Sequence, residues 1–182
     1  MTIKSLSPTH NLPRPMLAAC LILSLAACVT TPEHMEPVRD APVFSPTAFF
    51  TGRTVGEGVL KVLLAGTSHT HVEGAGHVEP DGTLVLQQQI KRDGKPFQSR
   101  TWRLRQAGDA QHFTGTLTTA EGPVTGEVNA SELHLRFTAD GGLDTEQWLY
   151  LQPGGRIAIN RMVVRKFGLP VAALDETIRK ED

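Results

Sequence analysis

The sequence contains very few cysteines, and both lie near its beginning. Among the 182 residues only Cys20 and Cys28 are cysteines, and none follows position 28. Disulfide bonds, zinc sites built on thiolates, iron–sulfur clusters and cysteine nucleophiles all require thiols. The chain beyond Cys28 is therefore excluded from each of these classes of site.

An excess of charge of either sign is also missing. Lys and Arg number 18 against 19 Asp and Glu, which gives a formal net charge of −1. Proteins that hold a nucleic acid by its phosphates usually display a basic surface. The composition therefore predicts no nucleic-acid partner.

No apolar run is long enough to cross a membrane as a helix. The run over residues 15–27 is about thirteen residues long, short of the roughly 20 that a spanning helix needs. It follows a weakly basic leader with Lys4, His10 and Arg14. A basic leader before a short apolar run is typical of an export signal. Residues 1–27 are therefore predicted to be a signal peptide that is removed.

The end of this run predicts a lipid anchor. Leu25-Ala26-Ala27-Cys28 has the form of a lipobox, in which the cysteine thiol is acylated and the chain is cut just before it. Leu17-Ala18-Ala19-Cys20 has the same letters, but only residues 15–19 would then form the apolar region. We favour Cys28 as the lipidated, palmitate-bearing residue over Cys20. An uncleaved anchor and a simple secretory signal remain the alternatives.

The residues after Cys28 predict a place in the cell envelope. Val29 rather than Asp follows the cysteine, which by the familiar sorting rule directs a lipoprotein to the outer membrane. More than one acyl chain on the cysteine would make the anchorage stable. Residues 28–48 contain four prolines and no apolar period, so they predict an extended tether. The expected location is the periplasmic face of the outer membrane.

Beyond the tether, no stretch shows the 3.6-residue period of a helix. Short segments instead alternate between apolar and polar residues. Residues 49–182 are predicted to form a single all-β domain. The expected strands, separated by turn sequences rich in Gly, Asp, Asn and Pro, cover residues 55–64, 69–78, 84–91, 99–104, 112–118, 124–128, 133–139, 147–151 and 157–166. Such an antiparallel meander most often closes into a calycin-like or lipocalin-like barrel. Residues 171–179 fit either a last strand or a short C-terminal helix.

Several short motifs together resemble a known family. In order they are Phe50-x-Gly52, Gly56-x-Gly58, Arg100-x-Trp102-x-Leu104, Gly126-Glu127, Trp148-x-Tyr150-Leu151, Asn160-Arg161 and Lys166-Phe167-Gly168. This series resembles the bacterial lipoproteins grouped as domain of unknown function 3833. Two acidic residues commonly precede the family tryptophan that matches Trp148, whereas this chain has Glu146-Gln147. The resemblance implies export, lipidation and a β-barrel-like fold, and it implies no reaction.

The candidate ligand-binding residues are basic and aromatic. Arg100 and Trp102 share one strand face, where a guanidinium beside an indole could hold the carboxylate of a fatty acid inside a barrel. The alternatives are an arginine stacked over Trp102 or paired with Glu127 as a structural fixture. Trp148, Tyr150 and Arg161 complete the candidate set, with a structural role as the alternative for each.

Metal binding and catalysis find weaker support in the sequence. His69, His71 and Glu73 occupy alternate positions of an expected strand, so their side chains share one face. The two histidines could bind zinc or copper there, although a polar face exposed to solvent explains them as well. No serine lies in a nucleophile-elbow sequence. We therefore expect no cofactor and no enzymatic activity.

The sequence leads to one favoured function and two alternatives. The favoured function is a membrane-anchored envelope lipoprotein whose barrel binds a lipid, a fatty acyl chain or another apolar ligand. The alternatives are an accessory lipoprotein with a filled core that docks to an envelope partner, and an enzyme that acts on lipids. Inward-facing small residues would leave room for a ligand, and the candidates are Ala65, Gly74, Gly76 and Gly115.

Overall fold

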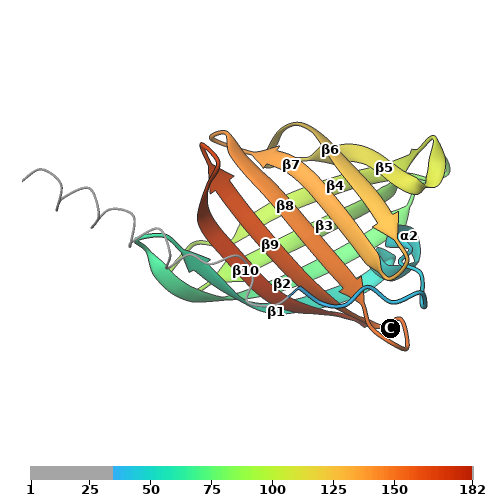
Figure 1. Cartoon of the computed structure of the whole chain (residues 1–182), viewed down its shortest axis with the longest axis horizontal. Coiled ribbons are helices and arrows are strands. Elements are labelled where there is room, and N and C mark those ends of the chain that lie inside the picture. Colours follow the sequence, from blue (N-terminus) through green and yellow to red (C-terminus); the bar gives the residue numbers. More distant parts are fainter. Residues whose placement is uncertain (1–34, 182) are drawn as a thin grey trace, which may run out of the picture.

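Ten antiparallel strands form a closed barrel (Figure 1). The computed structural model describes residues 35–181. The strands are β1 Gly52–Val62, β2 Gly66–Val78, β3 Leu84–Arg92, β4 Gln98–Ala107, β5 Asp109–Leu117, β6 Ala120–Asn129, β7 Glu132–Ala139, β8 Leu143–Leu151, β9 Ile157–Lys166 and β10 Leu169–Lys180. Each strand pairs with the next along the chain, and β10 pairs with β1 to close the barrel. The predicted all-β barrel is thus confirmed, and its last segment is a strand rather than a helix.

Alternation along the strands decides which side chains face inward. Leu84 and Leu86 of β3 lie opposite Leu104 and Trp102 of β4, and all four are buried. Because successive side chains point to opposite faces of a sheet, the residues between them point outward; of these, Arg103 is exposed and Val85 is buried. Inward positions of β3 to β10 form one continuous apolar core, in which Leu133 and Leu149 have no solvent exposure.

A short helix closes one end of the barrel. Helix α2, Pro46–Phe50, begins after Ser45, whose side-chain oxygen accepts a hydrogen bond from the Ala48 amide at 3.3 Å. Phe49 and Phe50 are buried and pack with Phe44, with ring centroids of Phe49 and Phe50 5.0 Å apart. Figure 1 shows α2 at the end where β1 begins and β2 ends. We call this the helix end and the opposite end the open end.

The residues before Phe44 lie on the outer surface of the barrel. The Arg39 amide donates to the Ser131 hydroxyl at 2.8 Å, and the Phe44 amide donates to the Ala130 carbonyl at 2.7 Å. Residues 35–48, which the sequence places in an extended tether, are therefore attached to the barrel. The predicted signal peptide and Cys28 lie outside the described residues. Within residues 35–181 no helix is long and apolar enough to span a membrane.

Candidate ligand-binding cavity

A small cavity lies inside the barrel, between α2 and the open end. Its volume is about 20 Å³, which is room for about one water molecule. Apolar side chains, including Phe50 and Trp102, form most of its wall. Four polar side chains also line it, namely Gln88, Arg100, Gln147 and Glu176. A polar group within an apolar barrel costs free energy unless it is paired, so this cluster calls for an explanation.

Arg100 is a cation held against an aromatic ring. It lies on β4 opposite Gln88 of β3, and its Nε donates to Gln88 Oε1 at 2.7 Å. The Trp102 indole donates to the same oxygen at 2.8 Å, and the guanidinium lies 5.3 Å from the Trp102 ring centroid. Burial lowers the pKa of Arg100. In the described part of the chain no carboxylate forms an ion pair with Arg100 within 4 Å.

Glu176 supplies the acidic group of the cavity. It is buried on β10, and Asn160 Nδ2 donates to its Oε2 at 2.7 Å. Burial raises the pKa of this carboxyl group, against the opposing influence of Asn160 and Arg100. Desolvation favours the protonated form, so Glu176 compensates the Arg100 charge less than an exposed carboxylate would.

Two glycines of β1 make the space that Glu176 occupies. A Cβ atom at Gly56 would lie 2.4 Å from Glu176 Oε1, and one at Gly58 would lie 2.9 Å from both Glu176 Cβ and Thr70 Oγ1. Gly58 pairs directly with Glu176 across the β1–β10 ladder. Glu176 is not identified as a site residue from the sequence, which shows Gly56 and Gly58 only as part of a motif. The available signal was their spacing of two, which places both on one face of a strand.

Two further polar atoms near the cavity have no hydrogen-bond partner within residues 35–181. Gln147 is 6% exposed and lines the cavity, yet its Oε1 accepts no hydrogen bond. Asn160 Oδ1, beside Glu176, is also buried and unpaired. Such atoms are uncommon in folded proteins and usually face a water molecule or a ligand. Among the described residues, the cavity thus contains a guanidinium without a carboxylate partner and, in Gln147 Oε1, a buried acceptor without a hydrogen bond.

The structure separates the predicted binding residues into two groups. Arg100 and Trp102 face the cavity, as described above. Trp148 and Arg161, in contrast, lie on the outer face, where Trp148 stacks on His134 with ring centroids 4.6 Å apart. Arg161 pairs with Glu36 at 3.0 Å and with Asp175 at 3.4 Å.

Tyr150 belongs with the outer group. It alternates with the core residues Leu149 and Leu151, and it is buried in spite of its outward direction. Burial, with Glu132 and Glu36 nearby, raises the pKa of its hydroxyl. Tyr150 thus lies near the segment that precedes α2 and does not line the cavity.

The small residues do not provide the expected space. A Cβ at Gly74 would lie 2.4 Å from Thr54 Oγ1, and one at Gly76 would lie 2.0 Å from the Phe50 carbonyl oxygen. At Gly115 a Cβ would meet the Arg103 carbonyl oxygen at 1.8 Å. These glycines allow close approach of the chain rather than a cavity. Ala65 lies exposed in the turn between β1 and β2.

The two candidate metal ligands lie on the outer face of β2. His71 sits between two carboxylates, with Nδ1 2.6 Å from Glu57 Oε1 and Nε2 3.4 Å from Glu73 Oε1. The hydrogen bond with Glu57 raises the pKa of His71. His69 faces the same side, and its amide donates to Asp93. Within residues 35–181 no group of three His, Cys, Asp or Glu side chains has the arrangement of a metal site.

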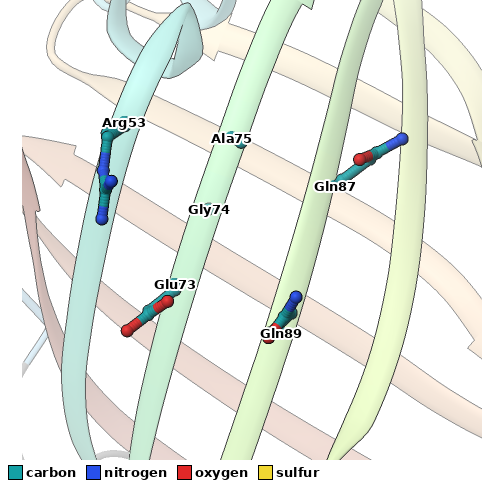
Figure 2. Close-up of a pocket in the computed structure, with 6 residues that line it drawn as sticks. All are labelled: Arg53, Glu73, Gly74, Ala75, Gln87 and Gln89. Atoms are coloured by element: carbon teal, nitrogen blue, oxygen red, sulfur yellow. The ribbon is translucent and has the colours of Figure 1, made fainter.

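A second hollow lies on the outside of the barrel, over β1, β2 and β3. Figure 2 shows Arg53, Glu73, Gln87 and Gln89 around the small residue Ala75. The hollow measures about 230 Å³, and every side chain that lines it is exposed. It offers no desolvated charge, so the interior cavity is the better candidate site.

Comparison with solved structures supports the fold. The chain is similar to the S-type phycobiliprotein lyase CPES from Guillardia theta, with a TM-score of 0.60 and 10% sequence identity. The match covers 76% of this chain and 94% of the lyase chain. No curated protein matches the sequence.

Comparison with protein families identifies relatives in sequence. The model of the family described as protein of unknown function (DUF3833) matches residues 22–180, which include all ten strands. The resemblance inferred from the short motifs is therefore confirmed. The chain belongs to the DUF3833 family.

Proposed function

We propose that this protein is an envelope lipoprotein whose barrel binds one small amphipathic ligand, with the anionic group of the ligand at Arg100. The observation that carries this proposal is the cavity-lining guanidinium, which has no ion pair among the described residues, in the same cavity as Gln147 Oε1, which accepts no hydrogen bond there. A guanidinium has five N–H donors in a planar fork that matches carboxylate and phosphate groups. A core that served packing alone would gain stability from apolar residues at these positions.

The open end offers the route by which such a ligand would enter. Leu60, Ile90 and Met162 lie on the inward face of their strands, nearer the open end than Arg100 and Glu176, and they are only partly buried. An acyl or other apolar tail would contact these side chains while the anionic group reaches Arg100. Because the cavity has room for only about one water molecule, a bound tail would have to displace the side chains of Leu60, Ile90 and Met162. Met162 is well suited to this because its unbranched side chain adapts to irregular spaces.

The filled interior favours a second candidate, an accessory lipoprotein that docks to a partner. The cavity of about 20 Å³ is much smaller than the several hundred Å³ typical of ligand sites. In that case the polar cluster would hold a bound water and have no further role. A ligand-binding barrel should contain a bound amphipathic molecule, whereas an accessory lipoprotein with a filled core should contain none.

A binding role fits the polar cluster better than catalysis. The polar side chains that line the cavity are an arginine, a glutamate and two glutamines. Nucleophilic catalysis requires a nucleophile in hydrogen-bond contact with a base, and the lining of the described cavity has no such pair. The similarity to a lyase concerns the fold and assigns no reaction to this chain.

Native mass spectrometry with lipid extraction tests the proposal. The protein would be exported with a secretory leader as residues 28–182 carrying Cys28→Ser, and purified without detergent. This form keeps Phe44 and Ser45, which a version starting at residue 49 would lose. We expect one anionic amphipathic molecule per chain in the wild-type barrel and none in Arg100→Gln.

The control changes an arginine on the other face of the same strand. Arg103 points outward and pairs with Glu79, so Arg103→Gln should retain the ligand. Far-ultraviolet circular dichroism and thermal melting check that all three proteins are folded. A ligand-free mass for the wild type, with no uptake of added fatty acid or lysophospholipid, would favour the accessory lipoprotein instead.

A further inference from the structure

Four large apolar side chains are exposed together at the open end of the barrel. They are Leu64 at 91%, Phe97 at 70%, Phe167 at 90% and Leu169 at 62% exposure. Leu64 belongs to the β1–β2 turn, Phe97 to the β3–β4 turn and Phe167 to the β9–β10 turn, and Leu169 is the first residue of β10. We call these four residues the apolar rim. Grouped exposed apolar residues mark interaction surfaces, whereas single ones do not.

The three turns are neighbours around the barrel. β10 pairs with β1, β1 with β2, and β2 with β3. The Leu63 amide donates to the Val171 carbonyl at 2.8 Å, which joins the β1–β2 turn to the start of β10. On the other side of the β1–β2 turn, the Asp93 amide donates to the His69 carbonyl at 3.2 Å, which joins the β3–β4 turn to β2. Figure 1 shows the β1–β2 and β9–β10 turns at the same end, away from α2. The rim thus follows one arc of the open end.

The backbone at two rim positions is unfavourable for the residues found there. Leu64 has φ 64° and Phe167 has φ 51°, a left-handed conformation that bulky residues rarely adopt. Glycine or asparagine would form these turns at a lower cost. Folding therefore gives no reason for large apolar side chains at the tips of both turns, and a role in binding does.

The charge around the rim indicates the chemistry of the partner. The rim turns and the adjoining strand ends carry one acidic residue, Asp93, and the basic residues Lys61, Lys91, Arg92 and Lys95. Two further basic residues there have partners on neighbouring elements, since Arg165 pairs with Glu146 and Lys166 donates to the Gly141 carbonyl. The two other turns at the open end carry Glu121, Asp140 and Asp144 and, within the described chain, no exposed large apolar side chain. Apolar side chains among basic residues are complementary to an anionic phospholipid surface.

We propose that the apolar rim inserts into the interface of an anionic phospholipid bilayer, so that the open end of the barrel faces the membrane. The basic residues would contact lipid headgroups while Leu64, Phe97, Phe167 and Leu169 enter the boundary of the acyl region. A symmetric contact with a second copy is less favourable, because it would bring two basic surfaces together.

The geometry of the chain before the barrel is compatible with this orientation. Glu36 pairs with Arg161 on the outer face of β9, and the strand rises about 20 Å from Arg161 to Phe167 at the open end. The segment from Cys28 to Met35 can reach at most about 25 Å. A lipid on Cys28 could therefore lie level with the rim. This position of Cys28 rests on the proposed anchor, whereas insertion of the apolar rim does not require a lipid on Cys28.

Vesicle flotation of the unanchored protein tests the proposal. Residues 28–182 carrying Cys28→Ser would be mixed with vesicles of phosphatidylcholine containing about 30 mol% phosphatidylglycerol, a strongly anionic surface. We expect the protein to float with these vesicles and to bind pure phosphatidylcholine more weakly. Phe97→Ser combined with Phe167→Ser should weaken binding roughly tenfold or more, because both rings leave the apolar layer.

A matched control removes an exposed apolar side chain at the other end. Val43 is 62% exposed, precedes α2 and lies far from the rim, so Val43→Ser should bind vesicles like the wild type. Equal binding by the Phe97/Phe167 variant, or no binding by the folded wild type, would overturn the proposal. A concentration-dependent dimer that the same variant abolishes would also overturn it and assign the rim to a second copy.

Vesicle binding through the apolar rim is independent of ligand binding in the cavity. Arg100→Gln leaves the rim unchanged, so it should float with anionic vesicles like the wild type whether or not the barrel contains a ligand. Failure of the ligand experiment would therefore leave the membrane proposal intact, and the converse also holds.

Discussion

Glu176 makes one contribution to the pH dependence of the stability of the barrel. Its pKa is raised in the folded state because the carboxyl group is buried. The folded protein therefore holds the Glu176 proton more tightly than the unfolded chain does. The resulting contribution to stability is fully present below the unfolded pKa of a glutamate, and it is lost as pH rises through the raised pKa.

We expect Glu176→Gln to remove this loss of stability. The amide keeps the shape of the side chain and cannot ionise, so the free energy of unfolding of the variant relative to wild type should increase as pH rises across that window. Urea unfolding at a series of pH values measures the difference. Glu127→Gln on the exposed face of β6 should show no comparable trend. A difference that stays constant with pH would show that burial does not perturb Glu176.

At the scale of elements, α2 seals one end of the core. Phe49 is buried, and its ring lies 5.4 Å from that of Phe44 and 5.0 Å from that of Phe50, centroid to centroid. We expect Phe49→Ala to lower the free energy of unfolding by about 3 kcal/mol, since a cavity replaces the ring. Val43→Ala on the exposed segment before α2 should change it by less than about 0.5 kcal/mol. Denaturant unfolding measures both, and equal effects would show that α2 does not contribute to the core.

The elements differ in how far the sequence predicts them. The expected strands and their turns match β1 to β9 within a few residues, because alternation and turn residues are local properties. Helix α2 was not foreseen, since Pro46–Phe50 is too short to show a helical period. The helix is stable because Phe44, Phe49 and Phe50 pack into the core, and that core forms only when the barrel closes.

At the scale of the whole molecule, a lipid on Cys28 would attach the barrel to a membrane. We propose that Cys28 carries the lipid, and we expect radioactive palmitate to label the wild type and Cys20→Ser but not Cys28→Ser. The reason is that acylation requires the thiol at the lipobox position. Metabolic labelling followed by purification measures this, and the mass of the mature N-terminal peptide identifies the cut. Label that persists in Cys28→Ser and disappears in Cys20→Ser would place the anchor at Cys20.

The sequence by itself determined the all-β barrel class and the family, and it predicts a lipid anchor. These depend on local patterns: alternation, turn residues, short motifs and the apolar run before Cys28. Only the tertiary structure decided the candidate site. Alternation could place Trp148 and Tyr150 on one face of a strand, but barrel closure determines that this face is the outer one. Closure also brings Arg100 of β4 and Glu176 of β10 to one cavity, because residues distant in sequence meet only when the sheet closes on itself.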